Sequence, residues 1–304
     1  MNKRIILSLA SALLFLGGCI KEDLSRCPQG KYIVFETINP KYPFGQIVSK
    51  VDLYLYDDRE TLVGRYTYSR EQLQADGLRA RLPKQPDGNY FLVALVNHED
   101  CFATTGAETR STLRTGVKTE AGDSVSFKLA DIYHGCKDIS FVSSTSESCD
   151  KVYLSKNTNN VNLTVELRDA DNPQATAALL STAVTGTNGT YDSRNTPVGT
   201  GKLTYLPHTT KAVSALHDFR TMRMWIGDDL TVHARRTDNG QQQSLPLTGT
   251  LSGMEIDGYK PYDTDEKLEL EDEFDIHVVF DGQMTIVALK INDWYLIKQP
   301  GIDL

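Results

Sequence analysis

The chain has 304 residues, a formal net charge of −8 and 40% hydrophobic residues, which suits one or two globular domains of ordinary size. The acidic balance and the lack of a basic stripe argue against nucleic acid as a partner, because acidic surfaces repel a phosphate backbone. After the first twenty residues, no apolar stretch approaches the roughly 20 residues that a membrane-spanning helix needs.

The first 18 residues have the pattern of a secretory signal peptide. Lys3 and Arg4 form a short basic region, and residues 5–16 are apolar except for two serines. This apolar segment is too short to span a bilayer and fits the core of a signal peptide. We expect residues 1–18 to be removed. The remaining 286 residues (304 − 18) then carry 30 basic and 40 acidic side chains, a net charge of −10.

The sequence Leu16-Gly17-Gly18-Cys19 resembles a bacterial lipobox, in which the cysteine thiol takes a diacylglycerol. Two or three acyl chains, each worth about 0.8 kcal/mol per buried methylene, hold a protein on a membrane almost permanently. We therefore expect lipid on Cys19 and a lipidated tether over residues 19–29. The alternative is an ordinary signal peptide followed by a chance cysteine.

A short charged segment follows Cys19 after one residue and consists of Lys21, Glu22 and Asp23. It resembles the acid-containing signal that directs lipoproteins of Bacteroidota type to the outer face of the outer membrane. A flexible, solvated spacer would look similar. The expected location is the cell outer membrane, with the protein lipid-anchored and exposed at the surface.

Four cysteines remain once Cys19 carries lipid: Cys27, Cys101, Cys136 and Cys149. An even number in an exported protein favours disulfides, and three pairings are possible. Cys136 with Cys149 is the most local pairing, and a loop of that size is worth about 3 kcal/mol. Cys27 would then pair with Cys101. Zinc is the rival interpretation, but the sequence contains no CxxC or HxxxH pair.

For most of the mature chain, the sequence pattern predicts strands separated by turns. In chain order, the runs rich in β-branched and aromatic residues cover residues 32–35, 51–56, 62–68, 90–96, 125–129, 152–154, 161–167, 222–226, 230–234, 274–280, 284–291 and 294–297. Residues 90–96 are almost continuously apolar, as expected for a strand buried on both faces. Asp281-Gly282 predicts a short hairpin. Short helices are expected only over residues 69–75 and 172–180.

The spacing of these strands predicts an all-β protein made of two tandem β-sandwich domains. A Ser-rich stretch between Asp138 and Asp150 is the candidate linker. The expected domains are therefore an N-terminal β-sandwich over residues 30–145 and a C-terminal β-sandwich over residues 146–304.

The sequence contains no recognisable catalytic constellation and no metal or cofactor motif, so we expect neither enzymatic activity nor a cofactor. The six histidines are scattered and are expected at the surface or in loops. Residues 257–275 hold nine carboxylates against Lys260 and Lys267, which is typical of a solvated loop. A glycosidase carboxylate pair or a weak calcium site in this run is the alternative.

Several motifs occur in an order that resembles the fimbrillin-A associated anchor proteins, the membrane-anchored subunits of type V fimbriae. After the lipobox come Asp23-Leu-Ser-Arg-Cys27-Pro28, Leu53-Tyr-Leu-Tyr-Asp57, Asp87-Gly-Asn-Tyr-Phe-Leu-Val-Ala-Leu-Val-Asn97, Asp131-Ile-Tyr-His-Gly135 and Ile291-Asn-Asp-Trp294. No single motif is highly specific, and the resemblance rests on their joint order from Cys19 to about Trp294. Residues 184–251 match nothing in that pattern.

The resemblance implies two transthyretin-like β-sandwich domains, no enzymatic activity, and a role in tethering a fimbrial fibre to the outer membrane and limiting its length. The implied partners are fimbrial shaft or accessory subunits, coupled by β-strand exchange. The chain would keep its own first strand and couple through its C-terminal segment, whose candidate residues are Trp294, Leu296, Ile297, Ile302 and Leu304. The alternative is that these residues complete the last strand of their own domain and a disordered tail.

Two other functions fit parts of the sequence. A surface lipoprotein could bind glycans or host proteins through its β-sandwich, with Tyr191, Tyr205 and Trp225 stacking on sugars, although core packing explains these residues equally well. A surface glycosidase is weaker, because no motif places a pair of acids.

Overall fold

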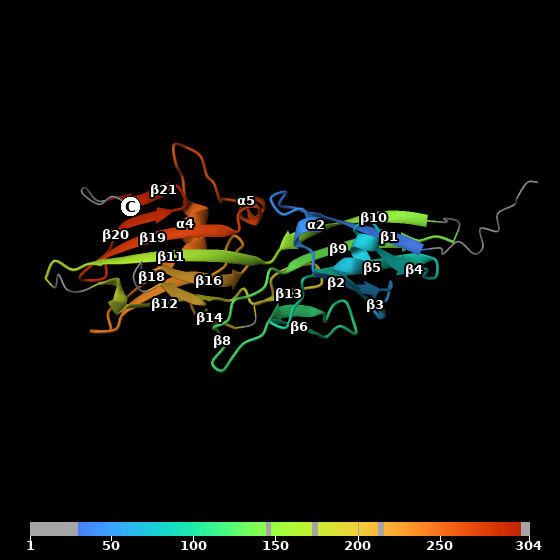
Figure 1. Ribbon diagram of the computed structural model, residues 1–304, viewed down its shortest axis with the longest axis horizontal. Coiled ribbons are helices and arrows are strands. Elements are labelled where there is room, and N and C mark those ends of the chain that lie inside the picture. Colours follow the sequence, from blue (N-terminus) through green and yellow to red (C-terminus); the bar gives the residue numbers. More distant parts are fainter. Residues whose placement is uncertain (1–29, 144–146, 172–175, 200, 212–215, 299–304) are drawn as a thin grey trace, which may run out of the picture.

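The computed structural model describes residues 30–298 apart from 144–146, 172–175, 200 and 212–215. The molecule is elongated, with the N-terminal and C-terminal parts of the chain at opposite ends of its long axis (Figure 1). Strands dominate both halves, which confirms the predicted all-β class. The transthyretin-like assignment and the number of domains remain predictions.

One half is built on a seven-stranded sheet with the order β3-β2-β5-β9-β10-β1-β4. Its strands are β1 (Gly30–Thr37), β2 (Lys50–Tyr56), β3 (Leu62–Ser69), β4 (Arg79–Pro83), β5 (Gly88–Val96), β9 (Tyr133–Phe141) and β10 (Glu147–Lys156). As predicted, β5 is buried on both faces: Leu92 packs into the larger cluster beneath the sheet and Val93 into a smaller cluster on the other side.

This first sheet curls around its core until its two edge strands meet. The Tyr68 hydroxyl of β3 donates a hydrogen bond to the Arg81 carbonyl of β4. Two short helices, α2 (Phe44–Ile47) and α3 (Arg70–Ala75), add Phe44 and Leu73 to the same core. The predicted helix over residues 69–75 is thus confirmed, and Ser69 begins it with a capping box to Gln72.

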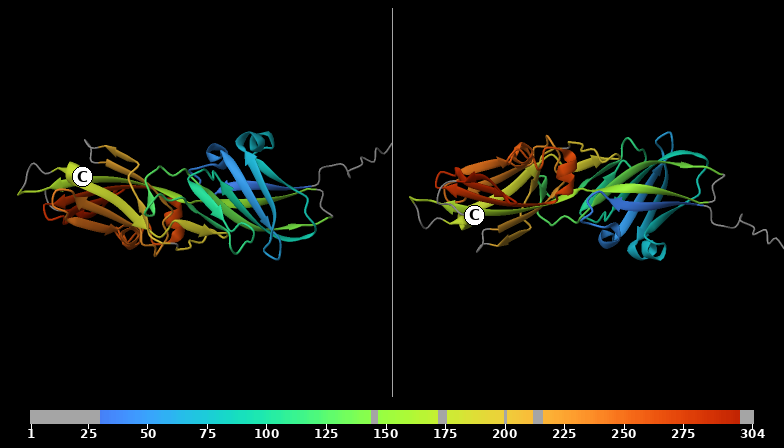
Figure 2. Two further views of the ribbon diagram at one scale, coloured as in Figure 1. Left: turned by 90° about the horizontal axis from the view of Figure 1, so that it is seen from below. Right: turned by 90° about the horizontal axis from the view of Figure 1, so that it is seen from above.

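The other half contains two packed sheets (Figure 2). The six-stranded sheet has the order β15-β16-β11-β19-β20-β21 and the five-stranded sheet the order β18-β17-β12-β14-β8. The strands are β8 (Ser124–Val125), β11 (Thr158–Arg168), β12 (Leu180–Gly186), β14 (Leu203–Tyr205), β15 (Thr209–Lys211), β16 (Leu216–Met222), β17 (Thr231–Arg236), β18 (Gln242–Pro246), β19 (Glu273–Asp281), β20 (Ile286–Ile291) and β21 (Trp294–Lys298).

Alternation explains why these two sheets pack face to face. Along β11, Val161, Leu163 and Val165 are buried, whereas Asn162 and Thr164 point outward. The helical segments of this half are η3 (Ala177–Leu179), α4 (Leu247–Gly253) and α5 (Asp265–Leu270). Of the predicted helix over residues 172–180, residues 172–175 lie outside the described residues and only the 3₁₀ turn η3 is present.

The two halves share strands. β8 precedes β9 in the chain but pairs in parallel with β14 of the five-stranded sheet. β13 (Thr190–Asp192), whose Tyr191 is buried in the core of the C-terminal half, pairs with β7 (Arg114–Val117), which also pairs with β6 (Phe102–Thr105). Leu129 and Ile132 likewise pack into the core of the C-terminal half. The halves are interlaced rather than joined by one linker.

The Ser-rich stretch lies between β9 and β10, both of which belong to the first sheet. β10, which the predicted boundary at residue 146 assigns to the C-terminal sandwich, is hydrogen-bonded to β1 along its length. After β10, the last strand of the first sheet in chain order, the chain passes into the second half at Asn157, and β11 begins almost without interruption. Whether the halves fold as separate domains is untested.

Both halves contain hairpins, and the one predicted at Asp281-Gly282 is confirmed. β2 pairs with β3, and β19 pairs with β20 across the loop that starts at Asp281. In each loop an aspartate holds the turn: Asp57 Oδ1 accepts hydrogen bonds from the backbone of Arg59 and Thr61, and Asp281 Oδ1 accepts them from Gln283 and Thr285. The strand expected over residues 222–226 is wrong, because β16 ends at Met222.

Candidate functional site

The first strand of the chain is held on both of its edges. β1 pairs in parallel with β10 over eight residue pairs, from Gly30 opposite Glu147 to Thr37 opposite Leu154. Its other edge pairs antiparallel with β4 over five residue pairs. Because both edges are occupied, the described part of this sheet has no gap between β10 and β4 that a strand from another subunit could fill.

The C-terminal strand has a different position. β21 is the last strand of the six-stranded sheet and pairs with β20, with Trp294 opposite Ile291. Trp294 and Leu296 are partly buried against the core of their own half, whereas Ile297 is 40% exposed. The structure thus brings these three candidate coupling residues together in one edge strand, and the first two help to close their own core.

Several predicted site residues lie outside the described residues: the lipidation site Cys19, the export signal Lys21, Glu22 and Asp23, the cysteine Cys27, and the C-terminal candidates Ile302 and Leu304. The predictions made for them therefore stay predictions.

The three described cysteines are free thiols, so the structure shows no disulfide between Cys136 and Cys149, and this pairing stays a prediction. Cys136 in β9 lies opposite Val93, while Cys149 in β10 lies opposite Tyr32. The strand register holds the two thiols at separate places in the first sheet. Burial raises the pKa of Cys136 and of Cys101, which keeps both thiols protonated and weakly nucleophilic. The pairing of Cys101 with Cys27 is untested.

A cluster of charged residues joins the two halves where β10 passes into β11. Lys156, the last residue of β10, is ion-paired with Asp272, the residue before β19, and the side chains are only 5% and 3% exposed. Lys156 also lies 3.1 Å from Asp131, which in turn binds Arg220 of β16 at 2.6 Å. The Tyr42 hydroxyl, from the segment after β1, donates to Asp272 at 2.7 Å. We call these five residues the junction cluster.

The electrostatics of the junction cluster favour an ionised Asp272. Burial by itself would raise the pKa of this carboxyl, but the hydrogen bonds from Lys156 and Tyr42 outweigh burial and hold the pKa below its usual value. Burial and the hydrogen bond to Asp272 together raise the pKa of Tyr42 to about 12. Asp272 therefore stays charged at neutral pH, between its two hydrogen-bond donors Lys156 and Tyr42.

The junction cluster corrects one part of the expectation for residues 257–275: most carboxylates of this run are exposed, as expected for a solvated segment, but one of them is not. This run contains helix α5, and Asp272 is buried. Nothing local in the sequence marks Asp272, because its partner Lys156 lies 116 positions earlier in the chain. The charge pattern of the sequence therefore does not indicate which of the nine carboxylates is buried.

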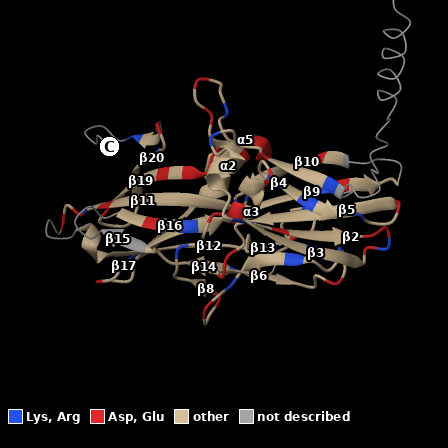
Figure 3. Cartoon of the chain, turned by 45° about the vertical axis from the view of Figure 1, so that its right-hand side comes forward, with Lys and Arg blue, Asp and Glu red and all other residues tan. Residues whose placement is uncertain are grey.

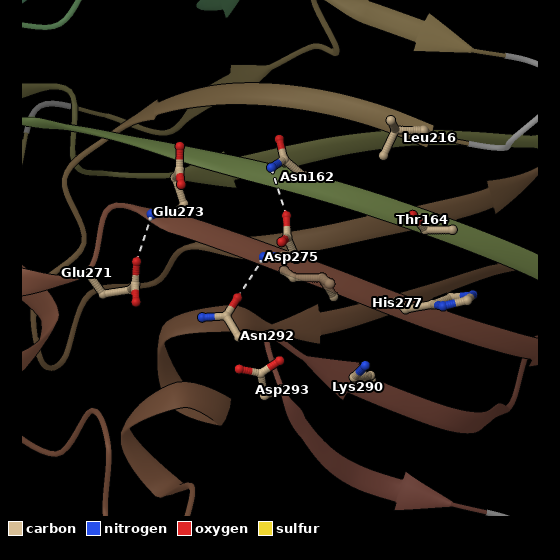
Figure 4. Close-up of a pocket in the computed structure, with 11 residues that line it drawn as sticks. Asn162, Thr164, Leu216, Glu271, Glu273, Asp275, His277, Lys290, Asn292 and Asp293 are labelled. Atoms are coloured by element: carbon tan, nitrogen blue, oxygen red, sulfur yellow. Dashed lines mark hydrogen bonds between the residues drawn. The ribbon is translucent and has the colours of Figure 1, made fainter. Parts of the chain in front are cut away.

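A hollow of about 520 Å³ opens on the outer face of the six-stranded sheet (Figure 4). Its polar side chains already bind one another: Asn162 donates to Asp275 at 2.8 Å, and Asn292 accepts from the Asp275 backbone at 2.8 Å. Its lining contains four carboxylates and one lysine, Lys290. The hollow therefore disfavours anionic ligands.

The aromatic residues suggested for sugar stacking are not available at the surface. Tyr191 and Tyr205 are each 1% exposed, and Trp225 packs edge-on against Tyr191 with ring centroids 6.4 Å apart. Burial raises the pKa of both tyrosines. These side chains belong to the core of the C-terminal half, so the proposed stacking platform is corrected.

The histidines were expected at the surface or in loops, and two of them are buried in strands. His134 of β9 is 1% exposed and His217 of β16 is 6% exposed. Burial lowers the pKa of His134 to about 4, so this ring is neutral at physiological pH. Within the described residues, no group of three His, Cys, Asp or Glu side chains is arranged to hold a metal ion.

Charges of both signs are spread over the two halves (Figure 3). Among the helices that the structure describes, none has the length and apolar character needed to span a membrane.

The architecture is that of an elongated, all-strand protein whose first strand is enclosed and whose last strand lies at a sheet edge. Residues 24–300 match the model of the family described as fimbrillin-A associated anchor proteins Mfa1 and Mfa2. The chain belongs to this family of fimbrial anchor proteins, which associates it with fimbrial subunits and with the cell surface. A sequence comparison with curated proteins gives no match.

Solved structures share the fold at low sequence identity. The fimbrial anchor protein Mfa2 from Porphyromonas gingivalis superposes with a TM-score of 0.72 at 19% identity, over 90% of this chain and 100% of that one. A candidate polysaccharide-binding protein from Bacteroides thetaiotaomicron gives a TM-score of 0.78 at 16% identity, over 90% and 99% of the chains. A candidate adhesin from Bacteroides ovatus gives 0.73 at 20% identity, over 90% and 97%.

Proposed function

We propose that this protein is a non-enzymatic anchor subunit, held at the outer face of the outer membrane by lipid on Cys19, that tethers a surface fibre and limits its length. Membership of the fimbrial anchor family supports the tethering role. The lipobox and the acidic residues at Glu22 and Asp23 support the lipid anchor and the surface location.

The single observation that carries the proposal is the enclosed position of β1. A subunit in the middle of a fibre grown by strand exchange must offer a vacant place for its neighbour's strand. Here β10 and β4 occupy both edges of β1. A chain that keeps its first strand can only end a fibre, and a lipid on the tether just before that strand makes it the membrane-side end.

In this proposal, the C-terminal segment is the part of the chain that binds the fibre. Trp294 and Leu296 are committed to their own core, so the part available for exchange begins at the exposed Ile297 and continues through the last six residues. That stretch places Ile302 and Leu304 two positions apart, the spacing at which both side chains of an extended strand face one sheet.

The test is co-purification of fibre subunits with the lipidated chain. Deleting residues 299–304 keeps β21 and should leave a folded, membrane-bound protein that no longer retains fibre subunits. The double substitution Ile302→Asp and Leu304→Asp should have the same effect, whereas the matched tail variant Asp303→Asn should bind normally. Unchanged co-purification by the deletion variant would contradict coupling through this segment.

A further inference from the structure

The strand directions place the start of β1 and the end of β21 at opposite ends of the molecule. β1 runs parallel to β10, and β10 leads toward the junction, so β1 starts at the far end of the first half. β21 runs in the same direction as β19, because each is antiparallel to β20, and β19 is parallel to β11. β21 therefore ends at the far end of the second half, as Figures 1 and 2 show.

A pull between the two chain ends consequently acts along the strands. To leave the first sheet, β1 must slide along β10 and β4, and this breaks the hydrogen bonds of 13 residue pairs (8 + 5) together rather than one after another. The sliding of β21 past β20, and of β19 past the nine residue pairs of β11, has the same geometry. Bonds that share a load equally yield at a higher force than bonds that open in sequence.

The junction cluster lies where tension crosses from one half to the other. Tyr42 follows β1, Lys156 ends β10, and Asp272 directly precedes β19. Nearby, the Asn39 side chain donates to the Leu270 carbonyl at 2.8 Å. The segment that follows β1 is thus hydrogen-bonded to the residues just before β19, and β19 leads toward the C-terminus. A broken buried ion pair leaves an uncompensated charge, so these bonds do not part easily.

We propose that the junction cluster is a mechanical lock, which makes the two halves yield as one unit when the chain is pulled between its N-terminal and C-terminal ends. The biological source of that pull, a membrane at one end and a fibre at the other, rests on the proposed function. The lock itself is a property of the single chain.

The test is single-molecule force spectroscopy on the mature chain, with handles at its two ends, in the absence of membrane and fibre. At constant force we expect the parent to unfold in one step. Asp272→Asn should shorten the lifetime at least tenfold and divide unfolding into two steps, because forced unfolding follows the unfolding rate. Failure here leaves fibre co-purification untouched, so the two proposals can fail separately.

Two control variants separate the lock from general loss of stability. Leu251→Ala truncates a fully buried side chain of α4, away from the pulled strands. At a comparable loss of denaturant stability, it should shorten the lifetime less than threefold and keep one step. Asp263→Asn, which removes an exposed ion pair with Lys267, should change nothing. The lock is overturned if Asp272→Asn unfolds in one step with a lifetime no shorter than that of Leu251→Ala.

A second geometry keeps every buried side chain of the parent, so it does not depend on a destabilised variant. Gly30 lies opposite Pro83, so a handle placed after Pro83 and another at the N-terminus would peel β1 from β4 one pair at a time. The lifetime in this geometry should be at least tenfold shorter than between the two ends. Equal lifetimes would contradict the proposed role of strand direction.

Discussion

The first and last strands that the structure describes, β1 and β21, differ in how they are held in their sheets. β1 has a partner on each side, whereas β21 pairs with β20 and ends its sheet. The same residue type illustrates the contrast: Ile33 of β1 is 0% exposed and Ile297 of β21 is 40% exposed. In the proposed function, the enclosed first strand lets the subunit end a fibre, and the edge strand leads into the segment that couples to it.

Breaking the connection between the halves should have the largest effect on stability. Asp272→Asn leaves Lys156 with the partly exposed Asp131 as its charged partner, so the cost should lie at the lower end of the about 3–5 kcal/mol typical for breaking a buried pair. Asp263→Asn, in an exposed pair, should cost about 0–1 kcal/mol. Chemical denaturation of both variants measures the difference, and equal values would show that the junction cluster contributes no more than a surface pair.

The next largest effect on stability should be the difference between substitutions in β1 and in β21. Ile33→Ala removes a buried side chain from the middle of the first sheet and should cost about 2–5 kcal/mol. The matched substitution Ile297→Ala should cost about 0.5 kcal/mol, because Ile297 is 40% exposed at the edge of its sheet. Similar losses of unfolding free energy for the two variants would mean that β1 is no better held than β21.

Acidification should lower the free energy of unfolding, because His134 is buried in its neutral form. The folded-state pKa of His134 is about 4, against about 6.5 in an unfolded chain. The unfolded state therefore binds more protons between these values. Stability should be full above pH 6.5 and fall by up to about 1.4 kcal/mol per pH unit as the pH drops toward 4. His134→Leu should flatten this slope in denaturation curves at stepped pH, and an unchanged slope would assign the effect elsewhere.

The sequence predicted much of the fold because strand alternation and turn residues act locally. The hairpins at Asp57 and Asp281 and the doubly buried β5 follow from such signals. It missed the three-residue β13, and it predicted a strand over residues 125–129 where only the two-residue β8 (Ser124–Val125) forms. Both strands are defined by distant partners, Thr115 for β13 and Tyr205 for β8.

The family motifs carry more structural information than their sequence suggests. In Asp131-Ile-Tyr-His-Gly135, Asp131 belongs to the junction cluster and His134 is buried. A side chain at Gly135 would lie 2.4 Å from the Tyr153 carbonyl of β10. Asn97, with a positive φ of 59°, accepts hydrogen bonds from the Ser49 backbone and hydroxyl. None of these roles could be read from the sequence, because each depends on a residue brought near by the fold.

The most direct test of the central claim is where the fibre goes when the lipid site is removed. In cells that carry Cys19→Ala as their sole copy, we expect assembled fibres to be recovered from the culture medium, while parent cells retain them at the surface. Quantification of fibre subunits in the cell and medium fractions measures this directly. Fibres that stay on Cys19→Ala cells in the parental amount would contradict the account, because the chain would then not be what holds them to the membrane.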